Sequence, residues 1–173
     1  MFWVIFIIII IIGIYIIIGD TDEFKKRIRT PEGDPKIDLD VIKCDNVPQG
    51  LEAEIAGLKD GLRITSMGYQ KFIPYDDVIE MSIESANQIV NNQKFSVGKA
   101  IAGTAVFGSA GAVAGLSGKK DLKMLVISYK KDYEVDYMLF LQKTKGSGDA
   151  FLLKKIYDDI KEVMSKHENS NNV

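Results

Sequence analysis

Lys123–Gln142, KMLVISYKKDYEVDYMLFLQ, is the stretch that decides the fold. Its two halves, Lys123–Lys130 and Tyr133–Gln142, are rich in β-branched and aromatic residues, and apolar and acidic residues alternate in the second half. A period of two places alternate side chains on opposite faces of a strand. Lys131 and Asp132, between the halves, make a connection as short as a tight hairpin turn. The stretch therefore predicts an antiparallel β-hairpin.

Shorter segments before this hairpin also have the composition of strands. They are Ile37–Asn46, Leu51–Leu58, Leu62–Ser66, Gln70–Pro74 and Val78–Ile83. Asp60-Gly61 between the second and third segments is a typical hairpin turn. The single cysteine excludes an internal disulfide, so a packed apolar core has to hold these strands together. The pattern predicts a mainly β domain.

The period changes after Gly146-Ser147-Gly148 from two to about 3.6 residues. Apolar residues then recur at helical spacing, at Phe151, Leu152, Ile156, Ile160, Val163 and Met164. Asp149 is a plausible N-cap. This pattern predicts an amphipathic helix of about 16 residues that packs on the sheet. Residues 167–173 are expected to form a polar, frayed tail, and the fold class is α+β, mainly β.

The chain begins with an apolar run, interrupted only by Gly13, which reads MFWVIFIIIIIIGIYIII over Met1–Ile18. As a helix it would be about 27 Å long, close to the thickness of the hydrocarbon core of a bilayer. A cleaved signal peptide is the alternative, but it requires a basic segment before the run and small residues at a cleavage site. Neither is present, so residues 1–19 are expected to be an uncleaved transmembrane helix.

Basic residues follow the run directly, at Lys25, Lys26, Arg27 and Arg29. Basic flanks stay on the cytoplasmic side of a membrane. We therefore expect a single-pass cell-membrane protein with its N-terminus outside and its C-terminal domain in the cytoplasm. Residues 20–36 are expected to be a basic juxtamembrane segment and linker, because the stretch 30–36 contains two prolines and a glycine.

A Gly/Ala segment, residues 98–118, interrupts the domain of residues 37–166. Six of its 21 residues are glycine and six are alanine, and Lys119 and Lys120 follow it. On a helical wheel one face carries Gly108, Gly111, Gly115 and Gly118, a spacing that allows close backbone packing or lipid contact. Three interpretations remain open: packing against the protein or a second copy, dipping into the membrane, or a full second span. A full span would separate the strands on its two sides.

Three features together resemble the bacterial pleckstrin-homology-like (PH-like) domain family. They are the GLRITS segment (Gly61–Ser66) leading into FIPYDDVI (Phe72–Ile79), the Gly/Ala insert, and the late hairpin followed by one helix. The resemblance covers residues 40–166. It implies a bent β-barrel or sandwich of about seven strands, capped by the C-terminal helix. The basic phosphoinositide-binding pattern of eukaryotic relatives is not matched, since only Lys59 and Arg63 flank the corresponding turn.

Chemistry-bearing residues are sparse. The only histidine, His167, is expected to be solvated in the tail, and Cys44 to be a structural thiol. Asp76 and Asp77 are adjacent and are expected to serve a turn rather than act as a catalytic pair. We therefore expect no catalytic residue, metal or cofactor, although an enzyme with an unrecognised site stays a minor alternative. The net charge of −2 gives no reason to expect nucleic-acid binding.

Several lysines, including Lys123, Lys130, Lys131 and Lys143, lie on or beside the late strands. They are expected to line a solvated edge of the sheet, or alternatively to face anionic lipid. Together these observations predict a membrane-anchored, non-catalytic binding or scaffolding module. Its partners would be membrane lipid and a protein not identified by the sequence, with a homo-oligomer also possible. The alternative is a self-assembling, membrane-active protein whose glycine segment inserts into the bilayer.

Overall fold

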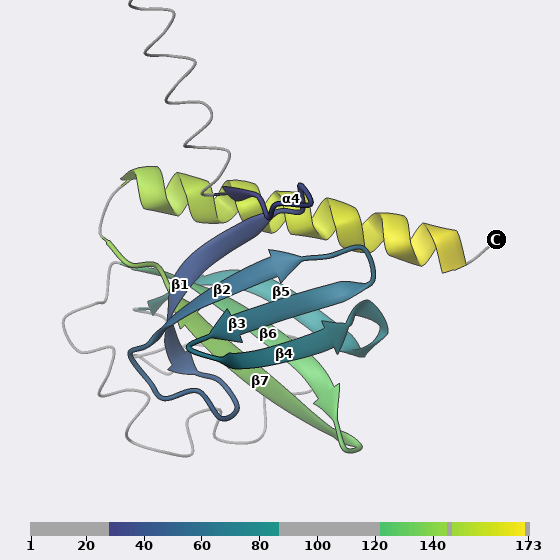
Figure 1. Cartoon of the computed structure of the whole chain (residues 1–173), viewed down its shortest axis with the longest axis horizontal. Helices are drawn as coiled ribbons and strands as arrows, with labels where there is room; N and C mark the ends of the chain where they lie inside the picture. The colour runs from purple at the N-terminus through teal and green to yellow at the C-terminus, as the bar shows by residue number, and fades with distance from the viewer. Residues whose placement is uncertain (1–27, 87–121, 145–146, 172–173) are drawn as a thin grey trace, which may run out of the picture.

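The computed structural model describes residues 28–86, 122–144 and 147–171 of the 173-residue chain (Figure 1). Its strands are β1 (Lys36–Lys43), β2 (Glu52–Gly57), β3 (Gly61–Ser66), β4 (Tyr69–Pro74), β5 (Val78–Ser85), β6 (Lys123–Lys131) and β7 (Glu134–Leu141). The 3-10 helix η1 spans Tyr75–Asp77 between β4 and β5. Helix α4 spans Ser147–Asn171 and follows the last strand. The β-segments expected from the sequence are therefore all strands.

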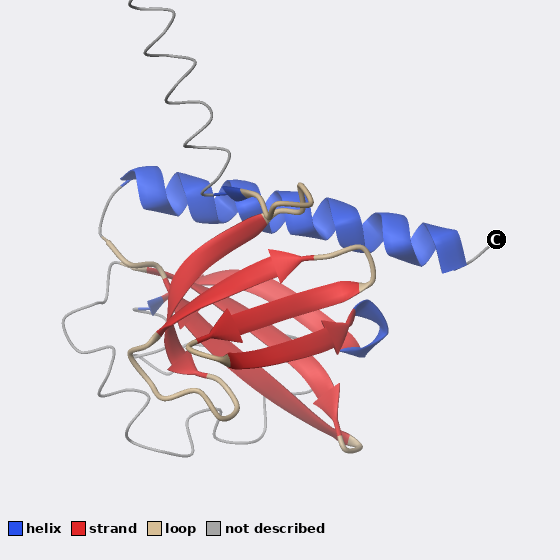
Figure 2. Ribbon diagram, in the orientation of Figure 1, coloured by secondary structure: helices blue, strands red, loops and turns tan. Residues whose placement is uncertain are grey.

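The strands form one antiparallel sheet in the order β4-β3-β2-β1-β7-β6-β5. Strand β1 joins its two halves, because it pairs with β2 on one side and with β7 on the other. The register shifts between Val41 and Lys43, and such a bulge bends a strand and increases its twist. Figure 2 shows the strongly bent sheet with α4 lying across one side. The predicted mainly β architecture with a C-terminal helix is confirmed.

The decisive hairpin is present, with its turn one residue later than the sequence predicts. Pairing runs from Met124 opposite Leu141 to Lys131 opposite Glu134. The two turn residues are Asp132 and Tyr133, whose φ angles of 49° and 71° are both in the left-handed region. Two left-handed residues match the twist of the flanking strands, as in type I′ turns. Tyr133 therefore lies at the hairpin tip rather than in the strand.

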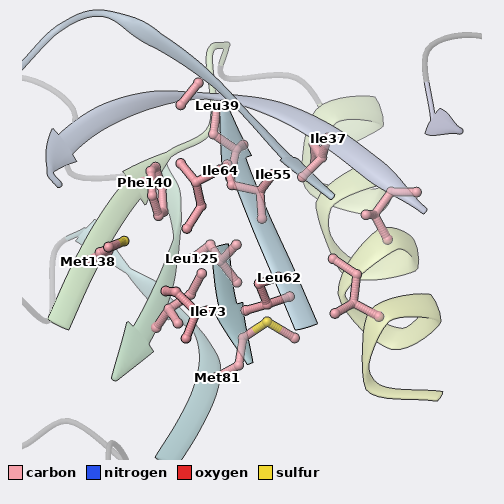
Figure 3. Packing of buried hydrophobic residues seen from close by; sticks show 14 of the residues in the cluster. Ile37, Leu39, Ile55, Leu62, Ile64, Ile73, Met81, Leu125, Met138 and Phe140 are labelled. Carbon is pink, nitrogen blue, oxygen red and sulfur yellow. The ribbon is translucent and has the colours of Figure 1, made fainter. Parts of the chain in front are cut away.

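The inner face of the sheet carries the main core, to which every strand contributes (Figure 3). The labelled side chains of that figure are Ile37, Leu39, Ile55, Leu62, Ile64, Ile73, Met81, Leu125, Met138 and Phe140. Helix α4 adds Leu153, Ile156, Ile160 and Met164, which recur at intervals of three or four residues. Each fully buried Leu, Ile or Phe side chain stabilises the fold by about 1.5–3 kcal/mol.

Helix α4 is fixed to the sheet at several points along its length. Ile160 packs so closely on β2 that a Cβ atom at Gly57 would lie 2.8 Å from its Cγ1. The Tyr157 hydroxyl donates a hydrogen bond of 2.9 Å to the Met81 carbonyl of β5. Arg29 forms an ion pair of 2.7 Å with Asp159. The helix therefore links β2, β5 and the segment before β1.

The outer face of the sheet carries a second apolar group, which we call the outer cluster. Its buried members are Ile42, Ala86, Leu122, Met124, Val126, Leu139 and Leu141. Met124 and Val126 alternate along β6 with Leu125 and Ile127 of the main core, so the two groups lie on opposite faces. Half-buried Tyr137 packs against the outer cluster.

Residues 87–121 connect β5 to β6, and these two strands pair with each other from Val78 opposite Tyr129 to Ser85 opposite Lys123. Paired strands lie on one side of any membrane. The connection therefore cannot cross a bilayer once, which excludes the full-span interpretation of residues 98–118. The other two interpretations stay open, since the segment lies outside the described residues.

Helix α4 has 25 residues instead of the predicted 16 or so. It continues to Asn171, through most of the expected polar tail. The last turns are stabilised by a Lys166–Glu162 ion pair four residues apart and by His167, whose ring packs edge-on against Tyr75. Asp149 lies inside the first turn rather than at the N-cap, and it accepts a hydrogen bond from Thr144. These contacts lie outside the apolar stripe, which is why the stripe predicts a helix shorter than the observed one.

The linker of residues 30–36 is a compact turn in the structure. The Asp34 amide donates to the Thr30 hydroxyl at 3.1 Å, and the backbones of Arg29 and Pro35 pair in an isolated antiparallel β-bridge. Gly33 has a φ of 95°, which residues with a side chain rarely adopt. Ile28 belongs to the main core. The packed domain therefore begins at least nine residues before Ile37.

Candidate functional site

The tip of the β6–β7 hairpin brings together two features, one on each face of the sheet. On the inner side lies a polar cluster, the tip network, made of Lys43, Asp45, Lys71, Tyr129, Lys131 and Asp136. Beside the turn lies a groove of about 610 Å³, the tip groove, lined by Asp77, Ile79, Lys130, Asp132, Tyr133, Glu134 and Val135.

The tip network is centred on Asp45, in the loop after β1. Its Oδ2 accepts hydrogen bonds from Lys71 Nζ at 2.8 Å and from Lys131 Nζ at 2.8 Å. The hydroxyl of Tyr129 donates to the same oxygen at 3.0 Å and lies 3.3 Å from an Asp136 oxygen. These contacts join β4, β6 and β7 to the loop.

Electrostatics within the tip network favour ionised carboxylates and a neutral phenol. Burial raises the pKa of Asp45, but hydrogen bonds from Lys131, Lys71 and Tyr129 outweigh it and hold the pKa well below its usual range. Burial and the hydrogen bond to Asp45 raise the pKa of Tyr129 far above its ordinary value. The phenol therefore acts as a hydrogen-bond donor at neutral pH, and ion pairs and hydrogen bonds hold the tip network together.

Lys43 connects the tip network to the outer face of the sheet. Its Nζ lies 3.1 Å from an Asp136 oxygen and 3.4 Å from the centre of the Tyr137 ring. A cation over an aromatic face gains about 0.5–1 kcal/mol at an exposed site. Lys71 lies similarly over Tyr129, at 4.3 Å. Since these lysines already have carboxylate or aromatic partners, they form no free basic pocket for a phosphate group.

Cys44 lies next to the tip network and is half-buried, as expected for a structural thiol. Its Sγ lies 3.7 Å from the sulfur of Met138. Burial raises the pKa of the thiol to about 11, so the thiolate nucleophile is scarce at neutral pH. Across the described residues no group of three or more His, Cys, Asp or Glu side chains is placed to hold a metal ion.

The tip groove has a different character, because it exposes large apolar side chains. Tyr133 is fully exposed, while Ile79 and Val135 are 42% and 44% exposed. Tyr133 also has a positive φ, which is strained for a bulky residue. Strain of this kind persists at binding sites, where the surrounding structure imposes it. The turn therefore presents an exposed aromatic side chain at the hairpin tip.

Charges of both signs surround these apolar side chains. Lys130 lies on one side of the groove, with Asp77, Asp132 and Glu134 around it. Lys130 Nζ donates to the Asp76 carbonyl at 3.3 Å, which fixes it beside η1. The groove is therefore amphipathic without a positive excess, a lining that suits a mixed peptide surface better than an anionic headgroup.

The described late lysines, Lys123, Lys130, Lys131 and Lys143, are all exposed, as expected for a solvated edge, and two of them also form ion pairs. Lys131 pairs with Asp45, and Lys143 pairs with Glu52 at 2.6 Å. Lys119 and Lys120 lie outside the described residues. Lys131 and Lys143 thus connect separate elements of the domain.

His167 lies in a different environment from the one expected. Its side chain is only 14% exposed and packs edge-on against Tyr75, with ring centres 5.6 Å apart. Its nitrogens lie 3.9 Å from Asp60 and 3.6 Å from Asp76. The prediction of a solvated tail histidine is wrong, because the helix continues far enough to bring the ring over η1.

The remaining residues selected from the sequence are mostly outside the described ranges. This applies to the membrane-orienting Lys25, Lys26 and Arg27, and to Gly108, Gly111, Gly115 and Gly118. Arg29 is described and is paired with Asp159. No helix in the described part of the chain is long and apolar enough to cross a membrane, and the run of residues 1–18 lies outside that part.

Comparison with protein-family models, with curated proteins and with solved structures gives no match. The tip network and the tip groove therefore carry the functional proposal through their own chemistry. Sequence reasoning missed both as sites. The alternation of β6 does place Tyr129 and Lys131 on one face, whereas Asp45 and Lys71 reach them only through the tertiary fold.

Proposed function

We propose that this chain is a membrane-anchored, non-catalytic binding module with a PH-like fold, and that the tip groove is its protein-binding surface. Exposure of Ile79, Tyr133 and Val135 around one groove is the observation that carries the proposal. Exposed apolar side chains grouped at one place mark interaction sites more often than singly scattered ones do. Tyrosine is also among the residues enriched where binding energy is concentrated.

The PH-like part of the proposal is supported by the topology. Two antiparallel meanders, β1–β4 and β5–β7, are joined through the β1–β7 pair and followed by a C-terminal helix, which agrees with the architecture that the sequence resemblance implies. Fold alone assigns no ligand, because one fold supports many functions. The ligand class is therefore argued from the groove.

A protein ligand suits the groove better than an inositol phosphate does. Phosphate recognition requires lysine or arginine side chains free to donate to an anion. Lys71 and Lys131 already donate to Asp45, and Lys43 pairs with Asp136. The groove itself combines one lysine with three carboxylates. Apolar contacts with polar groups at the rim are the usual anatomy of a protein interface.

The membrane-anchored part of the proposal is supported by the apolar run of residues 1–18. The described domain begins at Ile28, so about ten residues separate the run from the core. Ten extended residues span at most about 33–36 Å. The domain would therefore be held close to the membrane surface.

Site-specific photocrosslinking tests the binding surface in the full chain, kept in its native membrane. Tyr133 is replaced by the photoreactive aromatic p-benzoylphenylalanine, which preserves the shape at the tip. Phe151, a 68% exposed aromatic residue of α4, receives the same replacement as the matched control. We expect a discrete protein adduct from position 133 and none of that mass from position 151.

A competing variant makes the crosslink specific to the groove. Adding Ile79→Asp and Val135→Asp to the Tyr133 probe should lower the yield of the adduct by about tenfold or more, because apolar anchors dominate interface energy. Equal adducts from positions 133 and 151, or an adduct insensitive to the two aspartates, would overturn the proposal. Adducts with lipid alone, or with a second copy alone, would overturn it too.

A further inference from the structure

The β6–β7 hairpin carries three tyrosines, and two of them have a lysine placed over the aromatic ring. Lys71 Nζ lies 4.3 Å from the centre of the Tyr129 ring, and Lys43 Nζ lies 3.4 Å from the centre of the Tyr137 ring. Each of these lysines also forms an ion pair with an aspartate of the tip network, at 2.8 Å and 3.1 Å respectively. A tyrosine, a cation and a carboxylate thus occur together twice on this hairpin.

Tyr133, the third tyrosine, lies in the turn and has carboxylates beside it in the sequence. Asp132 precedes it, Glu134 follows it, and all three side chains are exposed. In the part of the chain that the structure describes, no lysine or arginine lies over the Tyr133 ring or within ion-pair distance of either carboxylate. The turn therefore presents an aromatic ring and two carboxylates to solvent.

The two lysines next to the turn are held by other groups. Lys130 Nζ donates to the Asp76 carbonyl at 3.3 Å, beside η1. Lys131 Nζ donates to Asp45 at 2.8 Å, on the inner side of the hairpin. Moving either lysine over the ring of the tip tyrosine would break these contacts, so the hairpin itself does not supply a cation there.

The lining of the tip groove is negatively charged. Three carboxylates, from Asp77, Asp132 and Glu134, accompany one ammonium group, from Lys130, so the formal charge of the lining is −2. The exposed apolar side chains described above lie in the same groove. A cationic group with apolar neighbours complements this lining in charge and in polarity, whereas an anionic ligand or the anionic surface of a membrane is repelled.

We propose that the partner bound in the tip groove is a basic peptide segment, which places a lysine or arginine side chain over Tyr133, next to Asp132 and Glu134. This inference rests on the proposed function, because it names the partner of the same groove. The face of the ring attracts a cation, and a carboxylate accepts hydrogen bonds from the same ammonium or guanidinium group. Apolar residues beside the basic one contact Ile79 and Val135. The arrangement at the other two tyrosines is then repeated between two chains.

Photocrosslinking from position 79 tests this inference in the full chain, kept in its native membrane. Ile79 is replaced by p-benzoylphenylalanine, which leaves the tip tyrosine native, and the crosslinked position in the partner is mapped by mass spectrometry. We expect a lysine or arginine within about three residues of that position, because three extended residues span about 10 Å.

Neutral variants of the turn test the role of charge. Asp132→Asn with Glu134→Gln removes both charges and keeps the side-chain shapes, and asparagine tolerates the left-handed turn position. The adduct yield should fall by about fivefold or more, and its decrease with added salt should be lost. Asp158→Asn with Glu162→Gln, at exposed positions of α4, is the matched control and should leave the yield unchanged.

Two substitutions of the tip tyrosine test the role of the ring. Tyr133→Leu keeps an apolar side chain but removes the aromatic face, whereas Tyr133→Phe keeps that face. The leucine variant should lower the adduct yield by about two- to fivefold, and the phenylalanine variant should leave it nearly unchanged, since a cation is attracted to either aromatic ring.

The outcomes separate this inference from the function on which it rests. Equal yields from the wild-type and neutral turns, equal losses from leucine and phenylalanine, or a partner site without a basic residue would overturn the inference and leave the groove a protein-binding surface. Absence of a protein adduct from both position 79 and position 133, or adducts with lipid alone, would overturn the inference and the proposed function together.

Discussion

Asp45 is the residue on which the tip network depends most. Its carboxylate accepts hydrogen bonds from two lysines and one tyrosine that come from β4 and β6. Hydrogen bonds to a charged group contribute about 1.5–3 kcal/mol each. Removing the charge leaves the lysine pair without its counter-ion, close to a buried phenol. The contacts of the tip network should then weaken, and the hairpin tip should lose its fixed position.

We expect Asp45→Asn to lower the free energy of unfolding by about 2 kcal/mol at pH 7. Because the folded state holds the pKa of Asp45 below its ordinary value of 3.8, the carboxylate stabilises the fold above pH 4. This contribution is lost as the pH falls below 4. Urea denaturation at several pH values should therefore show wild type and variant converging in acid. Asp158→Asn, an exposed change on α4, should alter stability by less than about 0.5 kcal/mol at every pH. A gap that is constant with pH would contradict the ion-pair account.

Gly61 illustrates a position where the backbone leaves no room for a side chain. A Cβ atom there would lie 2.4 Å from the Ile73 carbonyl oxygen of β4, and backbone cannot yield as a flexible side chain can. Gly61→Ala should destabilise the domain by about 1–3 kcal/mol, as overpacking does. Gly148→Ala is the matched control: nothing lies near its Cβ, and alanine favours the helix by about 0.8–1.0 kcal/mol. Denaturant midpoints should move in opposite directions, and a shared direction would refute the assignment.

At the scale of elements, helix α4 stabilises the fold through one face only. Ile156 is fully buried in the main core, whereas Phe151 is largely exposed on the same helix. Ile156→Ala should cost about 2–5 kcal/mol, and Phe151→Ala less than about 0.5 kcal/mol. Thermal unfolding followed by circular dichroism checks the difference. Similar losses from both variants would show that the helix packs differently from the structure.

The strands could be predicted from the sequence because their signal is local. Alternation along β6 and β7 requires only neighbouring residues, and the observed strand ends lie within a few residues of the expected ones. The end of α4 could not be predicted, since His167 is held by Tyr75, which is 92 positions away in the chain. The turn of the β6–β7 hairpin lies one residue later than the sequence predicts, because strand twist, rather than composition, selects the two left-handed positions.

The candidate site depends on contacts of long range, and the sequence pattern does not contain them. Asp45 lies 84 positions from Tyr129 and 26 from Lys71. Nothing in the neighbourhood of Asp45 distinguishes it from other loop aspartates. Strand alternation places Tyr129 and Lys131 on one face of β6, but Asp45 and Lys71 reach them only through the tertiary fold. The exposed groove follows from the turn, which presents Tyr133 outward.

The whole molecule combines an expected anchor with a described domain, and Arg29 belongs to both. As one of four basic residues after the apolar run, it favours a cytoplasmic flank. In the fold it also pairs with Asp159 of α4. Topology and stability can therefore be separated by mutating different members of the same basic group.

We expect the triple change Lys25→Gln, Lys26→Gln and Arg27→Gln to weaken the orientation of the chain without altering the stability of its domain. Arg29→Gln should do the reverse, lowering stability by up to about 1 kcal/mol, since its ion pair is partly exposed, while orientation persists. Protease protection of a tag after Val173 in intact cells reports orientation, and pulse proteolysis of the solubilised chain reports stability.

Because the positive-inside rule counts charges whereas an ion pair needs one particular partner, Arg29→Lys should preserve orientation fully and the pair only in part. A tag degraded by external protease in the wild type would reject the cytoplasmic placement, and equal effects of both variants on stability would show that the whole basic segment packs on α4.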